Sequence, residues 1–285
     1  MASRQKSSLL GAIALIAFCL IAFFGQWIVS PTMISNEQVA IWFFDVGQGD
    51  AILIQSGSEQ ILIDGGPSDL ILEKLSSVMP FWDRTIELVI STHPHADHLT
   101  GLNAVLDRYE VLEVWRPDQP YESDCARNFL DSATVSIVSS PTCEIIGPSR
   151  SLCILWPKES FNGASLEDEN DGSLVLLFRD GENEILLTGD TGEEEEVMLA
   201  KDLVDVDVLK VGHHGSLQST SSDFLQKIQP EIAVISVGEN SYGHPSQMVL
   251  DRLISSGAEV LRTDIQKDIR LLSNGVSLEM ASFDF

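Results

Sequence analysis

Short runs of alternating apolar residues mark the start of the folded region. Apolar side chains alternate over 39–43, and a glycine-rich turn at 47–50 leads into further apolar runs at 51–55 and 60–64. A period of two places successive residues on opposite faces of a strand. Three such runs separated by tight turns predict an antiparallel meander of three strands.

Strand-like and helix-like segments alternate further along the chain. Residues 86–91 predict a strand, the polar cluster at 92–98 a loop, and the spacing over 99–108 a helix. Prolines separate short apolar runs between 111 and 160, which predicts a region of irregular segments that extend from the scaffold (excursions). A polar loop between a strand and a helix is where α/β proteins place functional groups.

The second half again begins with strands and ends in strand-helix units. Its predicted elements are a hairpin of 174–178 and 184–188, a helix at 192–199, strands at 206–211, 232–237 and 259–262, helices opening at 219–222 and spanning about 247–256, and a closing hairpin that turns at 274–275. The two halves therefore resemble each other loosely. This order predicts an α/β (α+β) protein with two packed sheets and helices outside them, and not a doubly wound parallel sheet.

The N-terminal segment follows a different pattern. Residues 9–29 form an uncharged apolar run, close to the ~20 residues that cross a bilayer as a helix. Arg4 and Lys6 precede this run and no basic residue follows it before Lys74, so the positive-inside rule predicts a cytoplasmic N-terminus and a body on the outer side of the cytoplasmic membrane. The expected organisation is a cytoplasmic segment at 1–8, a single-pass transmembrane anchor at 9–29, a linker at 30–38 and one folded domain at 39–285.

Other interpretations of this apolar run remain open. A cleaved signal peptide ends at a small-x-small site, and no convincing site of that kind is present. A lipoprotein cysteine at Cys19 fits poorly after Phe18, and a buried core helix is the remaining interpretation.

Composition and charge narrow the classes of function. The chain is 44% hydrophobic, which excludes an acidic disordered protein, and its 17 basic against 43 acidic residues give a formal net charge of -26. Such a surface repels polyphosphate and argues against general nucleic-acid binding through Lys and Arg. If the substrate is a phosphate ester, groups other than basic side chains must supply positive charge.

Three cysteines, Cys125, Cys143 and Cys153, fall within one 29-residue stretch. In an exported body two of them can pair and leave one free, whereas three reduced, buried cysteines are the alternative. No CxxC motif is present, which argues against a structural zinc site of that type.

All six histidines fall in three places: His93, His95 and His98 around Asp97, then 213–214, then His244. The first cluster, Thr-His-Pro-His-Ala-Asp-His, supplies imidazoles and a carboxylate that can converge on Zn²⁺, Mn²⁺ or Fe. The structural alternative is a polar loop with Asp97 as the helix N-cap, although capping needs one such residue and not four.

The remaining polar candidates follow predicted strands. Asp64, Asp190, the pair at 213–214 and His244 each come shortly after an apolar run. Strand ends of one sheet system meet in space, so we expect these side chains to lie together. Asp190 suits a carboxylate bridging two ions, with a helix N-cap as the alternative, and a structural turn is the alternative for 213–214.

These motifs resemble the metallo-β-lactamase superfamily, whose fold is a four-layer αββα sandwich with one or two metals at the sheet edges. More narrowly, they resemble the extracellular hydrolase domain of the ComEC family of DNA-uptake proteins. The similarity covers nearly all of 40–285 and rests on the combination of the segments FDVGQGDA (44–51), IDGG (63–66), STHPHADH (91–98), LTGD (187–190), KVGHHGS (210–216) and YGHPS (242–246).

The resemblance implies a role for each candidate residue. One ion would be held by His93, His95 and Asp190, and a second by Asp97, His98, Asp190 and His214. Asp64 would support the histidine loop, His213 would face substrate or orient the second site, and His244 would point at the scissile group. The sequence leaves open an exchange of roles between His213 and His214. The candidate catalytic residues are therefore Asp97, His213 and His244.

The chain departs from the resembled pattern in two ways. The superfamily usually supplies a third histidine to the first ion from mid-chain, and no histidine lies between His98 and His213. The matching stretch at 169–175 offers Asn170 or Asp171 instead, which leaves partial occupancy of the first ion open. The uptake proteins also carry a polytopic channel, and here one apolar segment takes its place, so this chain cannot itself form a DNA channel.

The expected function follows from two divalent ions, with zinc as the expected metal and manganese as the alternative. Such ions lower the pKa of a bound water to ~7 and stabilise charge on the attacked group. We expect a membrane-anchored, extracytoplasmic phosphodiesterase or nuclease acting on single-stranded DNA, with a separate channel protein as a further partner. The alternatives are hydrolysis of a lactone, lactam or thioester, and a catalytically weak module that docks on a channel.

Overall fold

The computed structural model describes residues 38–132, 135–147 and 149–281. The predicted meander forms from β1 (Val39–Phe43), β2 (Ile52–Ser56) and β3 (Glu59–Ile63), which pair antiparallel in sequence order. Five more strands complete an eight-stranded sheet in the order β15-β14-β1-β2-β3-β4-β5-β6. These are β4 (Thr85–Ile90), β5 (Glu110–Arg116), β6 (Val135–Ile137), β14 (Ile269–Ser273) and β15 (Leu278–Met280).

A second sheet of seven strands packs against the first, in the order β13-β12-β11-β10-β9-β8-β7. Its strands are β7 (Cys143–Ile146), β8 (Arg150–Trp156), β9 (Val175–Asp180), β10 (Asn183–Leu187), β11 (Val208–Lys210), β12 (Ile232–Ile235) and β13 (Glu259–Arg262). Strands β10 to β13 run parallel, whereas β7 to β10 pair antiparallel. Two sheets packed face to face confirm the predicted sandwich and its α/β class.

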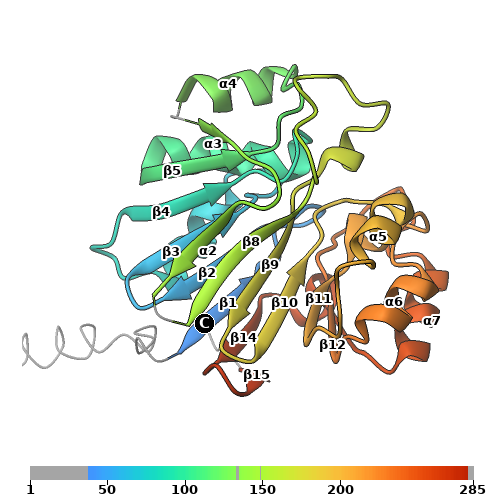
Figure 1. Ribbon diagram of the computed structural model, residues 1–285. Helices are drawn as coiled ribbons and strands as arrows, with labels where there is room; N and C mark the ends of the chain where they lie inside the picture. The colour runs from blue at the N-terminus through green and yellow to red at the C-terminus, as the bar shows by residue number, and fades with distance from the viewer. Residues whose placement is uncertain (1–37, 133–134, 148, 282–285) are drawn as a thin grey trace, which may run out of the picture.

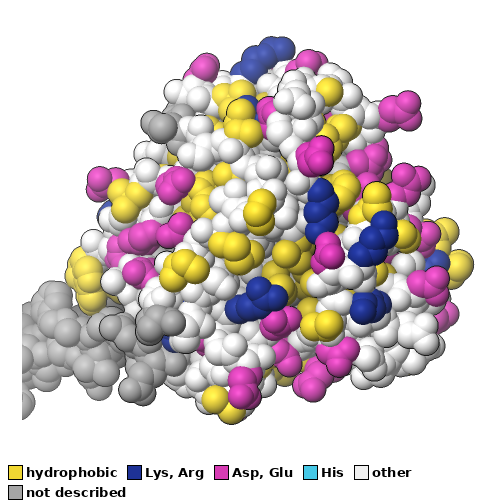
Figure 2. Space-filling view, viewed as in Figure 1, with side chains coloured by type: hydrophobic (Ala, Val, Ile, Leu, Met, Phe, Trp, Pro, Cys, Tyr) yellow, Lys and Arg dark blue, Asp and Glu magenta, His cyan; other side chains and the backbone are white. Residues whose placement is uncertain are grey.

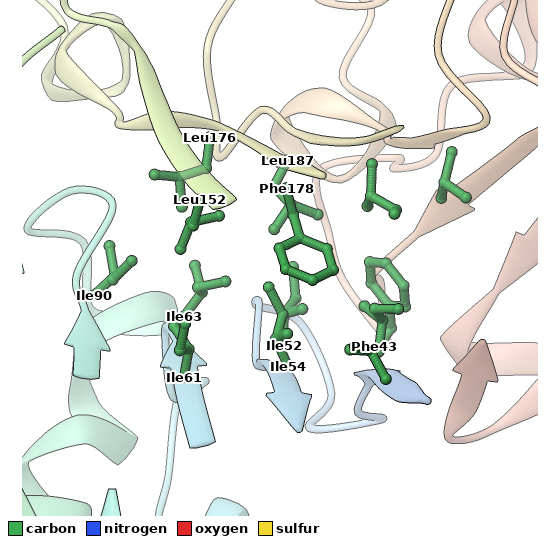
Figure 3. Packing of buried hydrophobic residues seen from close by; sticks show 14 of the residues in the cluster. Phe43, Ile52, Ile54, Ile61, Ile63, Ile90, Leu152, Leu176, Phe178 and Leu187 are labelled. Carbon is green, nitrogen blue, oxygen red and sulfur yellow. The ribbon is translucent and has the colours of Figure 1, made fainter. Parts of the chain in front are cut away.

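Both faces of each sheet are apolar, because successive residues of a strand point to opposite faces and most residues of the central strands are apolar. Phe43, Ile52 and Ile54 point from the first sheet toward Leu176 and Phe178 of the second, and these side chains interdigitate between the sheets (Figure 3). The intervening residues of the same strands point outward, under the helices. Burial of each such side chain contributes about 1.5–3 kcal/mol before conformational entropy is subtracted.

Helices cover the outer face of each sheet (Figure 1). The first sheet is covered by α2 (Leu70–Val78), α3 (Ala96–Arg108) and α4 (Asp124–Ser132), and the second by α5 (Glu193–Leu199), α6 (Ser222–Ile228) and α7 (Gln247–Ser256). Shorter elements are η1 (Glu169–Gly172), η2 (Gly212–Gly215) and α8 (Thr263–Gln266). The layers are therefore αββα.

The stretch 111–160 is more regular than its prolines suggested. It supplies β5 and β6 to the first sheet and β7 and β8 to the second, so the prediction of excursions was wrong for most of it. Strand β8 pairs with β9, although residues 157–174 separate the two strands in the sequence. Cys143 and Cys153 face each other across β7 and β8 and form a disulfide, while Cys125 is free.

The predicted membrane segment at 9–29 lies outside the described residues. Within the described ranges, every helix is too short or too polar to cross a bilayer. Acidic side chains are spread over the visible face of the molecule, in keeping with the composition (Figure 2).

Candidate metal centre

The site forms where strands of both sheets end. Asp64 directly follows β3, the histidine loop follows β4, and Asp190 follows β10. Because β3 and β4 run parallel in one sheet and β10 and β11 run parallel in the other, these ends lie at one edge of the sandwich. Helix α3 begins at Ala96 with His95 as its N-cap residue, three residues earlier than expected, so Asp97 lies in the first turn and is not the cap.

Hydrogen bonds to Nδ1, on the side of the ring that faces away from the cluster, determine that this nitrogen is protonated in three histidines. His98 Nδ1 donates to Asp64 Oδ2 at 2.8 Å, and His214 Nδ1 donates to the Ser236 carbonyl at 2.8 Å. The Thr92 hydroxyl donates to Asp64 Oδ2 at 2.7 Å, so it accepts from His93 Nδ1 at 3.0 Å. Each Nδ1 therefore carries a proton, which leaves the lone pair of Nε2 to a metal in place of a second proton, as in metal-ligating histidines with outer partners.

These lone pairs meet around one carboxylate oxygen. The Nε2 atoms of His98 and His214 are 3.3 Å apart, and each lies 3.3 Å from Asp190 Oδ2. Asp97 Oδ2 lies 3.4 Å from His214 Nε2, and His93 Nε2 lies 4.0 Å from Asp190 Oδ2. Facing lone pairs repel, so this cluster requires protons or cations between its atoms. Imidazole nitrogens with carboxylate oxygens fit Zn²⁺, Mn²⁺ or Fe, and we conclude that these residues fit a divalent metal.

His95 and the mid-chain loop complete the predicted ligand set. His95 Nδ1 lies 3.1 Å from His93 Nε2, while its Nε2 lies 3.2 Å from Glu169 Oε2 in η1. Glu169 thus orients His95 so that Nδ1 faces the cluster. Asn170 is buried beside the same site, and its Oδ1 has no hydrogen-bond partner. Of the two residues expected to stand in for a third histidine, only Asn170 lines the cavity.

Burial and charge act in opposite directions on the site's pKa values. Burial lowers the pKa of His98, but Asp190 and Asp64 outweigh it and raise that pKa well above its ordinary value. Burial likewise lowers the pKa of His214, yet Asp190 and Asp97 raise it to about 9. For Asp190, burial raises the pKa, whereas His214 and His98 bring it well below its ordinary range. Three buried or half-buried carboxylates, Asp64, Asp97 and Asp190, therefore make a strong site for positive charge.

A cavity of about 340 Å³ opens onto this cluster. Its lining residues are Gln48, His95, Ala96, Asp97, Asn170, Asp190, His213, His214, Tyr242 and His244. Both 213 and 214 have left-handed backbones, with φ of 47° and 53°, which turn His214 inward and leave His213 half-exposed. His213 Nε2 lies 4.0 Å from Asp190 Oδ2, and its ring centroid is 5.5 Å from that of His244. Six candidate site residues thus line this cavity: His95, Asp97, Asp190, His213, His214 and His244. His93 and His98 are fully buried next to Asp190.

The metallo-beta-lactamase superfamily profile matches residues 44–124 and 164–239, more than half of the chain. The chain belongs to the metallo-β-lactamase superfamily. Recombination protein 2 of Haemophilus influenzae is 30% identical over 233 residues, which are 80% of this chain and 28% of that protein. ComE operon protein 3 of Bacillus subtilis is 30% identical over 260 residues, which are 83% of this chain and 33% of that protein. These homologues are competence proteins of the ComEC family, which confirms the resemblance.

The chain spans about a third of the length of these relatives. Among solved structures, YhfI from Bacillus subtilis has a TM-score of 0.58 at 13% identity and covers 82% of this chain and 100% of its own. CmlA, a diiron beta-hydroxylase from Streptomyces venezuelae, has a TM-score of 0.53 at 16% identity and covers 82% of this chain and 54% of its own. Both likenesses show the metallo-β-lactamase fold.

Two buried residues near the cluster, Asp50 and Lys210, lie in the matching segments but were given no role from the sequence. Lys210 ends β11, is fully buried and forms an ion pair with Asp50 Oδ2. Its ammonium also donates to the Gly189 carbonyl at 2.9 Å. Asp50 precedes β2, and because β2 is antiparallel to β3, the beginning of β2 lies at the edge where β3 ends. Applying the strand-end argument to antiparallel strands would have found Asp50.

Proposed function

We propose that this metallo-β-lactamase domain is a metal-dependent phosphodiesterase or nuclease whose substrate is single-stranded DNA, with two zinc or manganese ions as its cofactors. The observation that carries the proposal is a pair of imidazoles beyond the predicted ligand set. His213 and His244 face the same cavity with ring centroids 5.5 Å apart. Two donors beside a cation site suit a tetrahedral, multiply charged oxyanion better than a planar lactam carbonyl.

The side chains at the cavity would have different roles in such a reaction. Bound divalent ions would supply an activated water and positive charge at the phosphate. Asp97 lies at the cavity; burial raises its pKa, but His214 and His98 outweigh burial and hold that pKa below its ordinary value. Its carboxylate therefore stays charged and can orient that water by accepting a hydrogen bond from it. Burial lowers the pKa of His213 and of His244, so both rings are neutral at neutral pH and each keeps one N–H to donate to the phosphate oxygens or to the leaving group.

The names of the relatives support a nucleic-acid substrate. Recombination protein 2, ComE operon protein 3 and Competence protein ComA are all similar to this chain over about 80% of its length. We also propose a channel protein as a further partner, which the competence names of these relatives support. The net charge of -26 makes the surface repel a phosphate backbone, and the two ions would supply the positive charge that attracts the phosphate at the site.

We further propose that residues 9–29 anchor the domain on the outer side of the cytoplasmic membrane. The basic residues before this segment and the Cys143–Cys153 disulfide both support that location, since disulfides persist in oxidising compartments. Protease added to spheroplasts should digest the domain while a cytoplasmic marker stays intact. Protection of the domain until the cells are lysed would reverse the proposed topology.

A substrate panel tests the chemistry. Purified protein loaded with Zn²⁺ or Mn²⁺ should cleave single-stranded DNA and an aryl phosphodiester, and leave a lactone, a thioester and a β-lactam intact. Protein stripped with a chelator is the matched control and should be inactive until metal is restored. Hydrolysis of the lactone, thioester or β-lactam, with every phosphodiester left intact, would replace the proposed substrate class. Metal-loaded protein inert on the whole panel would favour a docking module.

A further inference from the structure

The cavity beside the metal centre lacks the groups that usually hold a nucleic acid. Among the described residues that line it, none is a lysine or an arginine. Lys210 lies beneath the floor, buried in its ion pair with Asp50. Contacts to phosphates outside the reacting group therefore cannot come from basic side chains in this cavity. Affinity for a nucleotide must come from another kind of contact.

Tyr242 provides an aromatic face at the rim of this cavity. Its side chain is 74% exposed, the most of any large hydrophobic residue described here. Its ring lies 5.8 Å from the ring of His244, tilted by 32°. Exposed aromatic rings forgo the burial that stabilises them in a core, so a solvated ring at the mouth of a site is available to a ligand.

The loop that carries Tyr242 is held in one conformation by Asn240. The Oδ1 atom of Asn240 accepts the backbone N–H groups of Tyr242, Gly243 and His244 at 3.0–3.1 Å. Its amide nitrogen donates to the carbonyls of Gly238 at 2.9 Å and of His244 at 2.8 Å. Five hydrogen bonds from one side chain thus fix the loop, and a preorganised ring loses little entropy when it binds a partner.

The same loop is fixed against the first sheet. A Cβ atom at Gly238 would lie 2.4 Å from the backbone carbon of Gly47, so glycine is required for this close approach. The Gly238 N–H also donates to Gln48 Oε1 at 3.3 Å, and Gln48 lines the cavity. Tyr242, His244 and Gln48 therefore form one rigid rim with a flat apolar face and adjacent polar groups.

We propose that Tyr242 is the platform on which a nucleobase of the substrate stacks beside the metal centre, an inference that rests on the proposed phosphodiesterase function. Every base has a π-face, so stacking holds single-stranded DNA without basic residues and without sequence preference. A duplex keeps its bases stacked on each other, and so the platform favours single strands. His244, which the ring of Tyr242 contacts, then lies beside the phosphate that joins the stacked nucleotide to its neighbour.

The test separates stacking from catalysis by measuring equilibrium binding first. Full-length protein is titrated with a labelled oligodeoxyadenylate and with an oligomer of the same length made of abasic nucleotides. We expect Tyr242→Ala to weaken binding of the oligodeoxyadenylate by about 5- to 150-fold, the range for loss of one stacked base. Tyr242→Phe keeps the ring and should bind within about twofold of the natural protein. Tyr242→Leu keeps apolar bulk and should behave like the alanine variant.

The abasic oligomer and the salt dependence complete the design. Binding of the abasic oligomer should be equally weak in all four proteins, and binding of the oligodeoxyadenylate should change little with salt because few phosphates are neutralised. Equal affinity of the natural protein and Tyr242→Ala for the oligodeoxyadenylate would overturn the platform. If Tyr242→Ala lost as much affinity for the abasic oligomer as for the oligodeoxyadenylate, the platform would also be overturned, because Tyr242 would then contact the backbone.

Cleavage assays distinguish failure of this inference from failure of the proposed function. For each protein, kcat/KM on the base-containing oligomer is divided by kcat/KM on the abasic oligomer. If the natural protein cleaves phosphodiesters and this ratio is the same for Tyr242→Ala, stacking is wrong and the phosphodiesterase function stands. If no phosphodiester is cleaved, the proposed function fails, and the binding comparison still decides whether Tyr242 stacks a base.

Discussion

The ammonium group of Lys210 lies 3.6 Å from Asp190 Oδ1, while Oδ2 of the same carboxylate faces His98 and His214 at 3.3 Å. One oxygen of Asp190 is thus directed at a buried cation of the protein and the other at the predicted metal ions. Asp50 completes the arrangement by forming an ion pair with Lys210. Burial lowers the pKa of Lys210, but Asp50 and Asp190 outweigh it and raise that pKa, so the ammonium stays charged.

Lys210→Met should destabilise the fold and weaken metal binding. It leaves Asp50 buried without its partner, which costs about 3–5 kcal/mol of unfolding free energy. Lys210→Met with Asp50→Asn removes both charges of this ion pair, so most of that stability should return in urea unfolding. Metal affinity, measured by competition with a chelator, should stay low in the double variant because Asp190 Oδ1 still lacks its ammonium. Full recovery of metal affinity in the double variant would show that Lys210 serves stability alone.

The two predicted ions should respond differently to ligand removal. Asp190 Oδ2 lies between His93, His98 and His214, so Asp190→Ala should lose both ions. His93 faces only one side of the cluster, and His93→Ala should lose mainly one ion. Metal content per protein, measured by mass spectrometry after gel filtration, gives the stoichiometry. Two ions retained by Asp190→Ala would contradict a bridging carboxylate.

His244→Ala should lower the rate of phosphodiester cleavage by about 10²- to 10³-fold, as for the loss of one donor to a developing oxyanion. His244 lies beyond the predicted ligands, so metal content should equal that of the natural protein. Thermal unfolding serves as the control for the loop, since Asn240 binds the backbone of His244 and not its ring. Loss of metal together with rate would place His244 among the ligands.

Glu196 should make the stability of the fold depend on pH. Its carboxylate accepts the backbone N–H groups of Thr220 and Ser221, and burial raises its pKa from 4.5 to about 7 despite those bonds. The folded state therefore holds the proton more tightly than the unfolded state. Its contribution is complete below about pH 4.5 and is lost as pH rises through about 7, at about 1.4 kcal/mol per unit and about 3 kcal/mol in total.

Urea unfolding at intervals between pH 4.5 and 8 measures this slope. Glu196→Gln cannot titrate and should unfold with a correspondingly flatter pH dependence than the natural protein. Glu194→Gln removes an exposed acid from the same helix and should keep the natural slope. Parallel curves for Glu196→Gln and the natural protein would show that the raised pKa of Glu196 is wrong.

Several features of this protein could be read from local sequence. Alternation over 39–64 predicted three strands and their pairing, because a period of two and tight turns depend only on neighbouring residues. Strand-end placement likewise predicted that Asp64, Asp190 and the histidine clusters would share one edge. These positions follow from chain direction, which the order of elements alone defines.

Other features required contacts between distant parts of the chain. Strands β5 and β8 form where the sequence predicted excursions, because pairing with β4 and β9 satisfies their backbones. Which cysteines pair, and which of 213 and 214 is buried in the cluster, depend on register and on left-handed backbones that no local pattern indicates.

Sequence alone thus determined the two sheets and the residues that gather at the site, since periodicity and spacing carry that information, while the family was indicated by the resemblance of its motifs. Only the tertiary structure decided how those residues are oriented. The proton on each Nδ1, the ammonium of Lys210 against Asp190 and the ring of Tyr242 at the rim all arise from partners on other strands and loops. Hydrogen bonds and ion pairs act over a few ångströms, so they are defined only once the two sheets have packed.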